Sequence, residues 1–270
     1  PRAYYLPDVI CDFTGVTLEQ KAPNQVLVSG AKGLPPTDTY KVSATYPDGF
    51  RITGSFMMGG INAKKKAEVV STAILKKVSG LFEQRNIAPF TEVSVDILGT
   101  ETTYGKNASP LNTREVIVKI AATHADKKAL VLFSKEIAQA STSMAPGLTG
   151  LIGGRPKVSP VIRLFSFLQS KKDLGVFVQY ENKTRSTTID SSNNFDLRAI
   201  EPQRPLNTAT PATVQTVPLI KLAYARSGDK GNHSNIGVIA RHPSFLPAIA
   251  AALTESNVAN YMQHVLDEEH

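Results

Sequence analysis

The loop at residues 226–235 combines several side chains that can move protons. It reads Arg-Ser-Gly-Asp-Lys-Gly-Asn-His-Ser-Asn and joins two apolar runs that alternate as strands do. Asp229, Lys230 and His233 have the side chains that general acid and base catalysis requires. A polar loop between two strands is typical of a site that a rigid scaffold presents. We therefore take Asp229, Lys230 and His233 as candidate catalytic residues.

Neighbouring residues of the same loop suit the binding of an anion. Arg226 supplies a positive charge, and Ser227, Asn232 and Asn235 supply hydrogen-bond donors. A plain hairpin loop is the alternative, because Gly, Asp and Asn are also the residues that tight turns need. The loop is longer than the roughly two to five residues of a simple hairpin. Both interpretations therefore stay open.

Two glycine-rich stretches contain further candidate contacts for an anion. Gly59 and Gly60 precede a predicted helix, whose first backbone N–H groups can bind an anion. The alternative there is a solvated lysine face at residues 64–66. Arg155 lies near the end of the loop 141–158, which lacks the Gly-Lys-Ser/Thr of a phosphate-binding loop. For this loop, contact with a ligand and packing between domains are both open.

Asp38, Tyr40 and Lys41 form a third candidate group for contact with the substrate. A tyrosine can exchange protons when a nearby lysine lowers its pKa. Alternation along a strand directs Tyr40 and Lys41 to opposite faces and brings Asp38 and Tyr40 to the same face. Ordinary strand surface is the alternative.

The sequence identifies no cofactor and no metal site. The five histidines are scattered along the chain, so a zinc site has little support. The single cysteine, Cys11, lies in an apolar run and is expected to be a buried, unreactive thiol. A lone thiol fits a reducing compartment, and we expect the protein to be cytoplasmic. Without a long apolar run, a membrane span is not expected.

The positive charge of the chain lies in its first part. Residues 1–181 hold 22 Lys and Arg against 15 Asp and Glu, which accounts for the whole net charge of +7. Such a surface suits small anions, including the tail of coenzyme A, or nucleic acid. Nucleic acid is the weaker interpretation, because no basic stripe is interleaved with aromatic residues.

Three segments follow from composition. Residues 1–181 are predicted to form a basic α+β domain, 182–218 a polar linker, and 219–270 a small second module. From Phe50 to Phe167 the predicted order is β-α-β-β-α-β, a ferredoxin-like antiparallel sheet with both helices on one face. A doubly wound parallel sheet is the alternative, and it would want a G-x-G-x-x-G turn that is absent. We predict strands at 40–46, 50–58, 92–98, 115–121, 161–167 and 175–180, and helices at 63–85 and 125–140.

The inward faces of the two long helices can be read from the helical spacing of their apolar residues. The positions predicted to face inward are Ala67, Val70, Ile74, Val78 and Leu81 in the first helix, and Ala129, Phe133, Ile137 and Ala140 in the second. In the second module we predict two strands and two helices, which make an incomplete ferredoxin-like sheet.

Four stretches of the chain resemble the acyclic terpene utilisation protein AtuA family. They are YYLPDVICDF, GAKGLPPTDTYKVSATYPDGFR, GLIGGRPKVSPVIRLFSFL and LAYARSGDKGNHSNIGVIAR. The resemblance implies a cytosolic catabolic role on citronellol- and geraniol-type compounds, which are degraded as coenzyme A thioesters. It also implies that the chain, which begins at Pro1, is the second half of the large AtuA domain followed by the first part of a small ferredoxin-fold domain.

The expected function is that of an enzyme, or enzyme subunit, for branched acyclic acids or their coenzyme A thioesters. Asp229 or His233 would move a proton, and Arg155, Arg226 and Lys230 would hold an anionic group. The expected partners are a small-molecule substrate, an upstream domain or another chain, and further copies in a homo-oligomer. The alternative is a non-catalytic assembly module that pairs through the hairpin 219–241.

Overall fold

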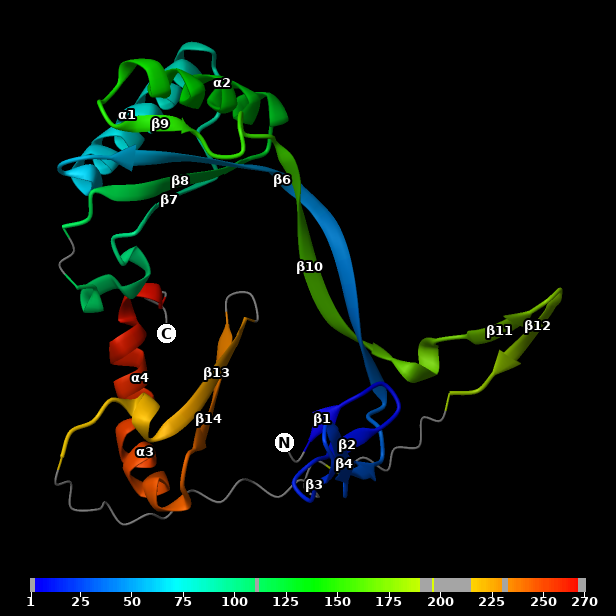
Figure 1. The fold of residues 1–270 in the computed structure, drawn as a ribbon. Coiled ribbons are helices and arrows are strands. Elements are labelled where there is room, and N and C mark those ends of the chain that lie inside the picture. The colour runs from blue at the N-terminus through cyan, green and yellow to red at the C-terminus, as the bar shows by residue number, and fades with distance from the viewer. Residues whose placement is uncertain (1–2, 110–111, 190–195, 197–214, 230–232, 267–270) are drawn as a thin grey trace.

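The protein is described by a computed structural model, and Figure 1 shows how its helices and strands are arranged. The residues that it describes are 3–109, 112–189, 196, 215–229 and 233–266. Every strand pair within these ranges is antiparallel, and helices accompany the strands. The predicted α+β class is therefore confirmed.

The largest sheet has five strands and is covered by two helices. Its strand order is β10-β6-β8-β7, and β9 also pairs with β6. The helices α1 (Ala63–Gln84) and α2 (Lys127–Ser143) lie on the same face of this sheet (Figure 1). Its strands are β6 (Thr39–Gly59), β7 (Glu92–Leu98), β8 (Glu115–His124), β9 (Leu148–Leu151) and β10 (Ser159–Ser170).

The core lies between the two helices and the sheet. Along β8, Val116, Val118 and Ile120 are buried and alternate with more exposed residues, as a strand covered on one face requires. The helix positions predicted to face inward are buried in α1 and α2, except that Leu81 is only partly buried against the core. Apolar spacing alone therefore predicted which face of each helix packs.

The segment Pro47-Asp48-Gly49 is not the hairpin turn that its composition predicts. Strand β6 continues through it, and its partner is β10. The register shifts between Pro160 and Ile162, so that an extra residue of β6 is accommodated as a β-bulge. Gly49 has φ of 73°, and a Cβ there would come within 2.9 Å of the His124 carbonyl oxygen. Gly49 therefore suits this bulge for the same reason that it would suit a turn, because both require a residue with positive φ.

The bulge divides β6 into a packed half and an exposed arm. From Phe50 to Gly59 the strand pairs with β8 under the helices, whereas residues 39–47 pair only with β10. Phe165 and Phe167 of β10 stack on each other at 5.9 Å, and both remain exposed. The arm extends from the helix-covered part of the sheet to the small sheets formed by the start of the chain (Figure 1).

Smaller sheets follow at the ends of the arm. Residues 25–29 form one strand of a hairpin, and the first 34 residues contain further short strands. The predicted linker 182–218 begins as a strand, because β12 pairs with β11 across the turn at Glu181 (φ 52°). These strands are β1 (Tyr4–Tyr5), β2 (Ile10–Asp12), β3 (Thr17–Ala22), β4 (Gln25–Ser29), β5 (Lys32–Leu34), β11 (Val176–Tyr180) and β12 (Lys183–Thr187).

The C-terminal module contains the predicted two strands and two helices. Strand β13 runs to Asp229 and β14 begins at Ser234, so most of the predicted loop is strand. Thr254 caps α4 by accepting a hydrogen bond from the Asn257 N–H at 3.2 Å. The elements are η4 (Leu219–Lys221), β13 (Ala223–Asp229), β14 (Ser234–Ala240), η5 (Pro243–Phe245), α3 (Leu246–Ala252), α4 (Glu255–Met262) and η6 (Gln263–Val265).

Two further 3₁₀ helices belong to the first module. They are η1 (Thr102–Asn107) and η2 (Lys171–Asp173). The first of them, η1, contacts η6 of the C-terminal module (Figure 1).

Gly147→Ala is expected to destabilise the protein by about 1–3 kcal/mol, because the position requires a conformation that alanine rarely adopts. Gly147 has φ of 93°, and a Cβ would overlap the Gly59 carbonyl oxygen. Gly150 nearby in β9 has open space around its Cβ position, so Gly150→Ala is the matched control. Urea unfolding of both variants measures the difference. Equal stability of the two would contradict this account of Gly147.

Candidate functional site

A cleft of about 820 Å³ lies between the β13–β14 hairpin and helix α4. Its volume is within the range of about 300–1,000 Å³ that is typical of small-molecule sites. The hairpin contributes Ser227, Asp229 and His233, three residues that the sequence analysis singled out. The helical side contributes an apolar wall. The cleft lining is Ser227, Gly228, Asp229, His233, Ser234, Ile236, Glu255, Val258, Ala259, Met262, Val265 and Leu266.

Strand alternation decides which of the predicted residues reach the cleft. Ser227 pairs with Ile236 and Asp229 with Ser234, and all four line the cleft. Residues between them in sequence point to the opposite face of the hairpin. Arg226 and Asn235 are therefore directed away from the cleft. The register does not support the expected grouping of Arg226 with Asp229, because the two residues are three positions apart along β13 and so belong to opposite faces.

The cleft lining is apolar along the helix and also includes two acidic side chains. Val258 and Met262 are one helical turn apart on α4 and are partly buried. Asp229 and Glu255 add two carboxylates from opposite sides. Ile236 remains 49% exposed, so the cleft has apolar surface that a ligand would cover. The arrangement suits a molecule with an apolar chain and a polar end.

The chemistry available at the polar end is proton transfer and hydrogen bonding. Asp229 can accept a proton, and His233 can donate or accept one. Ser227 and Ser234 supply hydroxyl groups beside them. Lys230 and Asn232, the remaining predicted members of this group, lie outside the described residues.

Sequence reasoning missed the helical wall of the cleft. Glu255, Val258 and Met262 were not among the candidate residues, although apolar residues at positions 258, 262 and 265 have helical spacing. That spacing predicts an apolar face of α4. It does not predict that this face lies against the hairpin, which is a long-range contact.

The predicted anion site at Gly59 and Gly60 is not supported. The Gly59 N–H donates to the Gly147 carbonyl oxygen at 2.7 Å, and the Gly60 N–H donates to the Arg114 carbonyl oxygen at 2.8 Å. Lys66 donates to the Gly59 carbonyl oxygen at 2.6 Å. Since both N–H groups already have backbone acceptors, neither is available to an anion.

The neighbours of Tyr40 are Asp8 and Lys171, which come from outside its strand. Its hydroxyl donates to Asp8 Oδ1 at 3.2 Å, and Lys171 Nζ lies 4.7 Å from its ring centroid. Burial and the Asp8 carboxylate raise the pKa of Tyr40, so the phenol keeps its proton. Lys41, one residue along the strand, belongs to the opposite face. The structure therefore argues against a tyrosine activated by Lys41.

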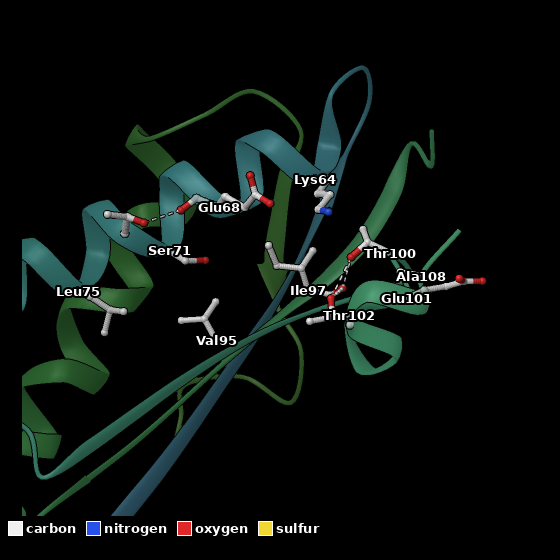
Figure 2. A pocket seen from close by; sticks show the side chains of 12 residues that line it. Lys64, Glu68, Ser71, Leu75, Val95, Ile97, Thr100, Glu101, Thr102 and Ala108 are labelled. Carbon is white, nitrogen blue, oxygen red and sulfur yellow. Dashed lines mark hydrogen bonds between the residues drawn. The ribbon is translucent and has the colours of Figure 1, made fainter. Parts of the chain in front are cut away.

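Asp38 and Arg155 are not brought to the cleft. The Asp38 carbonyl oxygen accepts the backbone N–H of Lys171 at 2.9 Å, which fixes the start of the arm. Arg155 is exposed after β9 and lines neither the cleft nor the cavity of Figure 2. Their proposed contacts with an anionic substrate have no support from this geometry.

A second cavity, of about 480 Å³, lies between α1, the end of β7 and η1 (Figure 2). Thr100 and Thr102 both point their hydroxyls at the Ile97 carbonyl oxygen, with distances of 2.7 Å and 2.8 Å. Ser71 is buried and donates to the Ala67 carbonyl oxygen. These hydroxyl groups are committed to the backbone, so the cavity has fewer free donors than its composition implies.

Side chains that could bind a metal ion or act as a nucleophile also occur elsewhere in the residues that the structure describes. In those ranges no cluster of three or more His, Cys, Asp or Glu could hold a metal ion. Cys11 is partly exposed rather than buried, which corrects the expectation. None of the helices in the described part of the chain is both long and apolar enough to cross a membrane.

The fold and the cleft define an α+β protein whose small C-terminal module carries a candidate small-molecule site. The family model described as "Acyclic terpene utilisation family protein AtuA" matches residues 1–180, and that of the "AtuA ferredoxin-like domain" matches residues 217–270. The chain belongs to the AtuA family, and the resemblance found in the sequence is confirmed. No curated protein and no solved structure matches the chain.

Proposed function

We propose that the protein acts in the catabolism of branched acyclic compounds by binding them in the C-terminal cleft. Membership of the acyclic terpene utilisation family supports the class of compound. The observation that carries the proposal is the cleft itself, in which an apolar helical wall faces Ser227, Asp229 and His233. A branched hydrocarbon chain would cover Val258 and Met262, and its functional group would lie at the hairpin.

The polar end of the ligand is inferred from the lining of the cleft. Val258, Met262 and Ile236 make much of this lining apolar. A free carboxylate would lose hydration on entering such a cleft, whereas a neutral ester or thioester carbonyl would lose less. We therefore favour a neutral carbonyl at the hairpin, as in an ester or thioester, over the free acid. Asp229 or His233, acting as a base, would take a proton from the carbon next to this carbonyl.

Titration calorimetry with geranic acid and its methyl ester tests the proposal. The ester is expected to bind more tightly than the acid by about tenfold at neutral pH, a difference of about 1.4 kcal/mol. The two compounds share their branched chain, so the comparison isolates the charge. Absence of saturable heat for both compounds would overturn the proposed function. Tighter binding of the acid would overturn the assignment of a neutral functional group.

We also propose that both modules have a ferredoxin-like fold. In the first module, the element order and the strand order β10-β6-β8-β7 support a split βαβ arrangement. In the second module, the family model supports it. We also propose a cytoplasmic location, in keeping with a lone cysteine, and an upstream domain or another chain as a partner.

Assembly through the hairpin is the second candidate function. The outer face of the hairpin exposes Tyr224 at 60% and Ile239 at 72%, and these two residues are paired in register. A second copy of the chain is the proposed occupant of this face, which would form a homo-oligomer. Light scattering of Tyr224→Ser with Ile239→Ser should then show a smaller particle than the wild type. An unchanged mass would remove this candidate.

A further inference from the structure

We propose that η1 of the first module positions the helical wall of the C-terminal cleft, so that ligand binding depends on both modules. This inference rests on the proposed function for its ligand. It concerns a contact between residues that are more than 150 positions apart in the chain. We call the contact between η1 and residues 261–264 the clasp.

The clasp contains three hydrogen bonds. Asn107 Nδ2 donates to the Tyr261 carbonyl oxygen at 3.1 Å, and Lys106 Nζ donates to Gln263 Oε1 at 3.0 Å. His264 Nε2 lies 3.0 Å from the Thr103 carbonyl oxygen. Because that acceptor is a backbone carbonyl, His264 donates through a protonated Nε2. Each of these hydrogen bonds contributes a modest amount of free energy, and together they fix the orientation of residues 261–264 relative to η1.

Gly105 gives the clasp its shape. The imidazole ring of His264 occupies the place where a Cβ at position 105 would stand. Gly105 also has φ of 52° and ψ of −125°, a conformation that L-residues rarely adopt. The 3₁₀ helix is therefore open at the point where the histidine enters. A side chain at position 105 would both strain η1 and displace the ring.

Hydrogen bonds within the first module fix the position of η1. Thr100 and Thr102 both donate to the Ile97 carbonyl oxygen at the end of β7 (Figure 2). On the other side of η1, the Ser109 N–H donates to Glu101 Oε2 at 2.6 Å. Because β7 is part of the largest sheet, the packing of that sheet fixes the orientation of η1.

The residues held by the clasp continue directly into the cleft wall. Met262 precedes Gln263, and Val265 follows His264; both Met262 and Val265 line the cleft. Helix α4 has eight residues, and a helix of this length is marginal without tertiary contacts. The clasp supplies such contacts at its C-terminal end. Releasing the clasp would loosen Met262 and Val265 while leaving the hairpin side chains unchanged.

Gly105→Ala tests the inference in the full chain, with Gly80→Ala as control. Gly80 lies in α1 with no atom within 4 Å of its Cβ position, so alanine is tolerated there. Hydrogen exchange of the amides of residues 255–266 is expected to accelerate by about tenfold or more in Gly105→Ala only. Binding of geranic acid methyl ester is expected to weaken by about fivefold or more in the same variant.

His264→Ala and His264→Asn give a second comparison that keeps Gly105. The alanine variant removes the donor, and the asparagine variant retains an N–H donor, so asparagine should restore part of the affinity. Faster exchange in Gly105→Ala without weaker binding would overturn the positioning role. Unchanged exchange would overturn the clasp itself. Failure of the wild type to bind the ester would overturn the proposed function, and the exchange result would still decide the clasp.

Discussion

Met262→Asp is expected to weaken the binding of the branched methyl ester by about tenfold to a hundredfold, which corresponds to about 1.4–2.7 kcal/mol. Met262 lies on the apolar wall of the cleft, where the hydrocarbon chain would cover it. A carboxylate at this position would have to lose hydration when the ligand binds, and it would not supply the apolar contact for the hydrocarbon chain of the ligand. Calorimetric titration of wild type and variant under the same conditions measures the loss.

Two control variants distinguish a loss of affinity caused by the cleft from losses caused by an added charge or by a change elsewhere in the hairpin. Val69→Asp introduces the same carboxylate at an exposed position of α1, 61% accessible, and should leave affinity unchanged. Arg226→Ala alters the outer face of the hairpin and should change affinity by less than about twofold. If Arg226→Ala weakened binding as much as Met262→Asp, the ligand would lie on the other face of the hairpin.

Phe133→Ala is expected to lower the free energy of unfolding by about 3–5 kcal/mol. Phe133 is fully buried on α2, and its ring meets that of Phe90 edge to face at 5.9 Å. Truncation would leave a cavity between α2 and the sheet and remove an aromatic contact. Urea unfolding monitored by circular dichroism measures the change.

Val131→Ala provides the matched control for this core substitution. Val131 belongs to the same helix and is 38% exposed, so it loses less buried surface. Its cost is expected to stay below about 1 kcal/mol. A similar loss for both variants would mean that the face of α2 has been assigned incorrectly.

The helices and their packed faces could be predicted from the sequence because their signals are local. Ile74 and Val78 of α1 and Ile137 of α2 recur at helical spacing, and each is buried. The α+β class followed from the same patterns. The end of α1 was predicted to within one residue, at Gln84 rather than Arg85.

The irregular parts could not be read from composition because the same residues serve different geometries. Pro47-Asp48-Gly49 has the composition of a reversing turn, yet only the partner strand decides between a turn and a bulge. The polar stretch 183–187 was assigned to a linker, but its backbone pairs with β11. Both errors arise because strand pairing depends on residues distant in sequence.

The candidate site residues stay a prediction, but the structure shows which of them lie together. Ser227, Asp229 and His233 do line one cleft. Arg226 was grouped with them because the stretch was taken as a loop, whereas strand parity sends it to the other face. The pairing of Tyr40 with Asp8 and Lys171 depends on long-range contacts, which no local pattern indicates.

A crystal structure of the protein with geranic acid methyl ester tests the central claim most directly. We expect the branched chain to lie against Val258 and Met262, with the ester carbonyl within hydrogen-bonding distance of Ser227 or His233. Ligand density in the cavity between α1, β7 and η1, with an empty C-terminal cleft, would contradict the account.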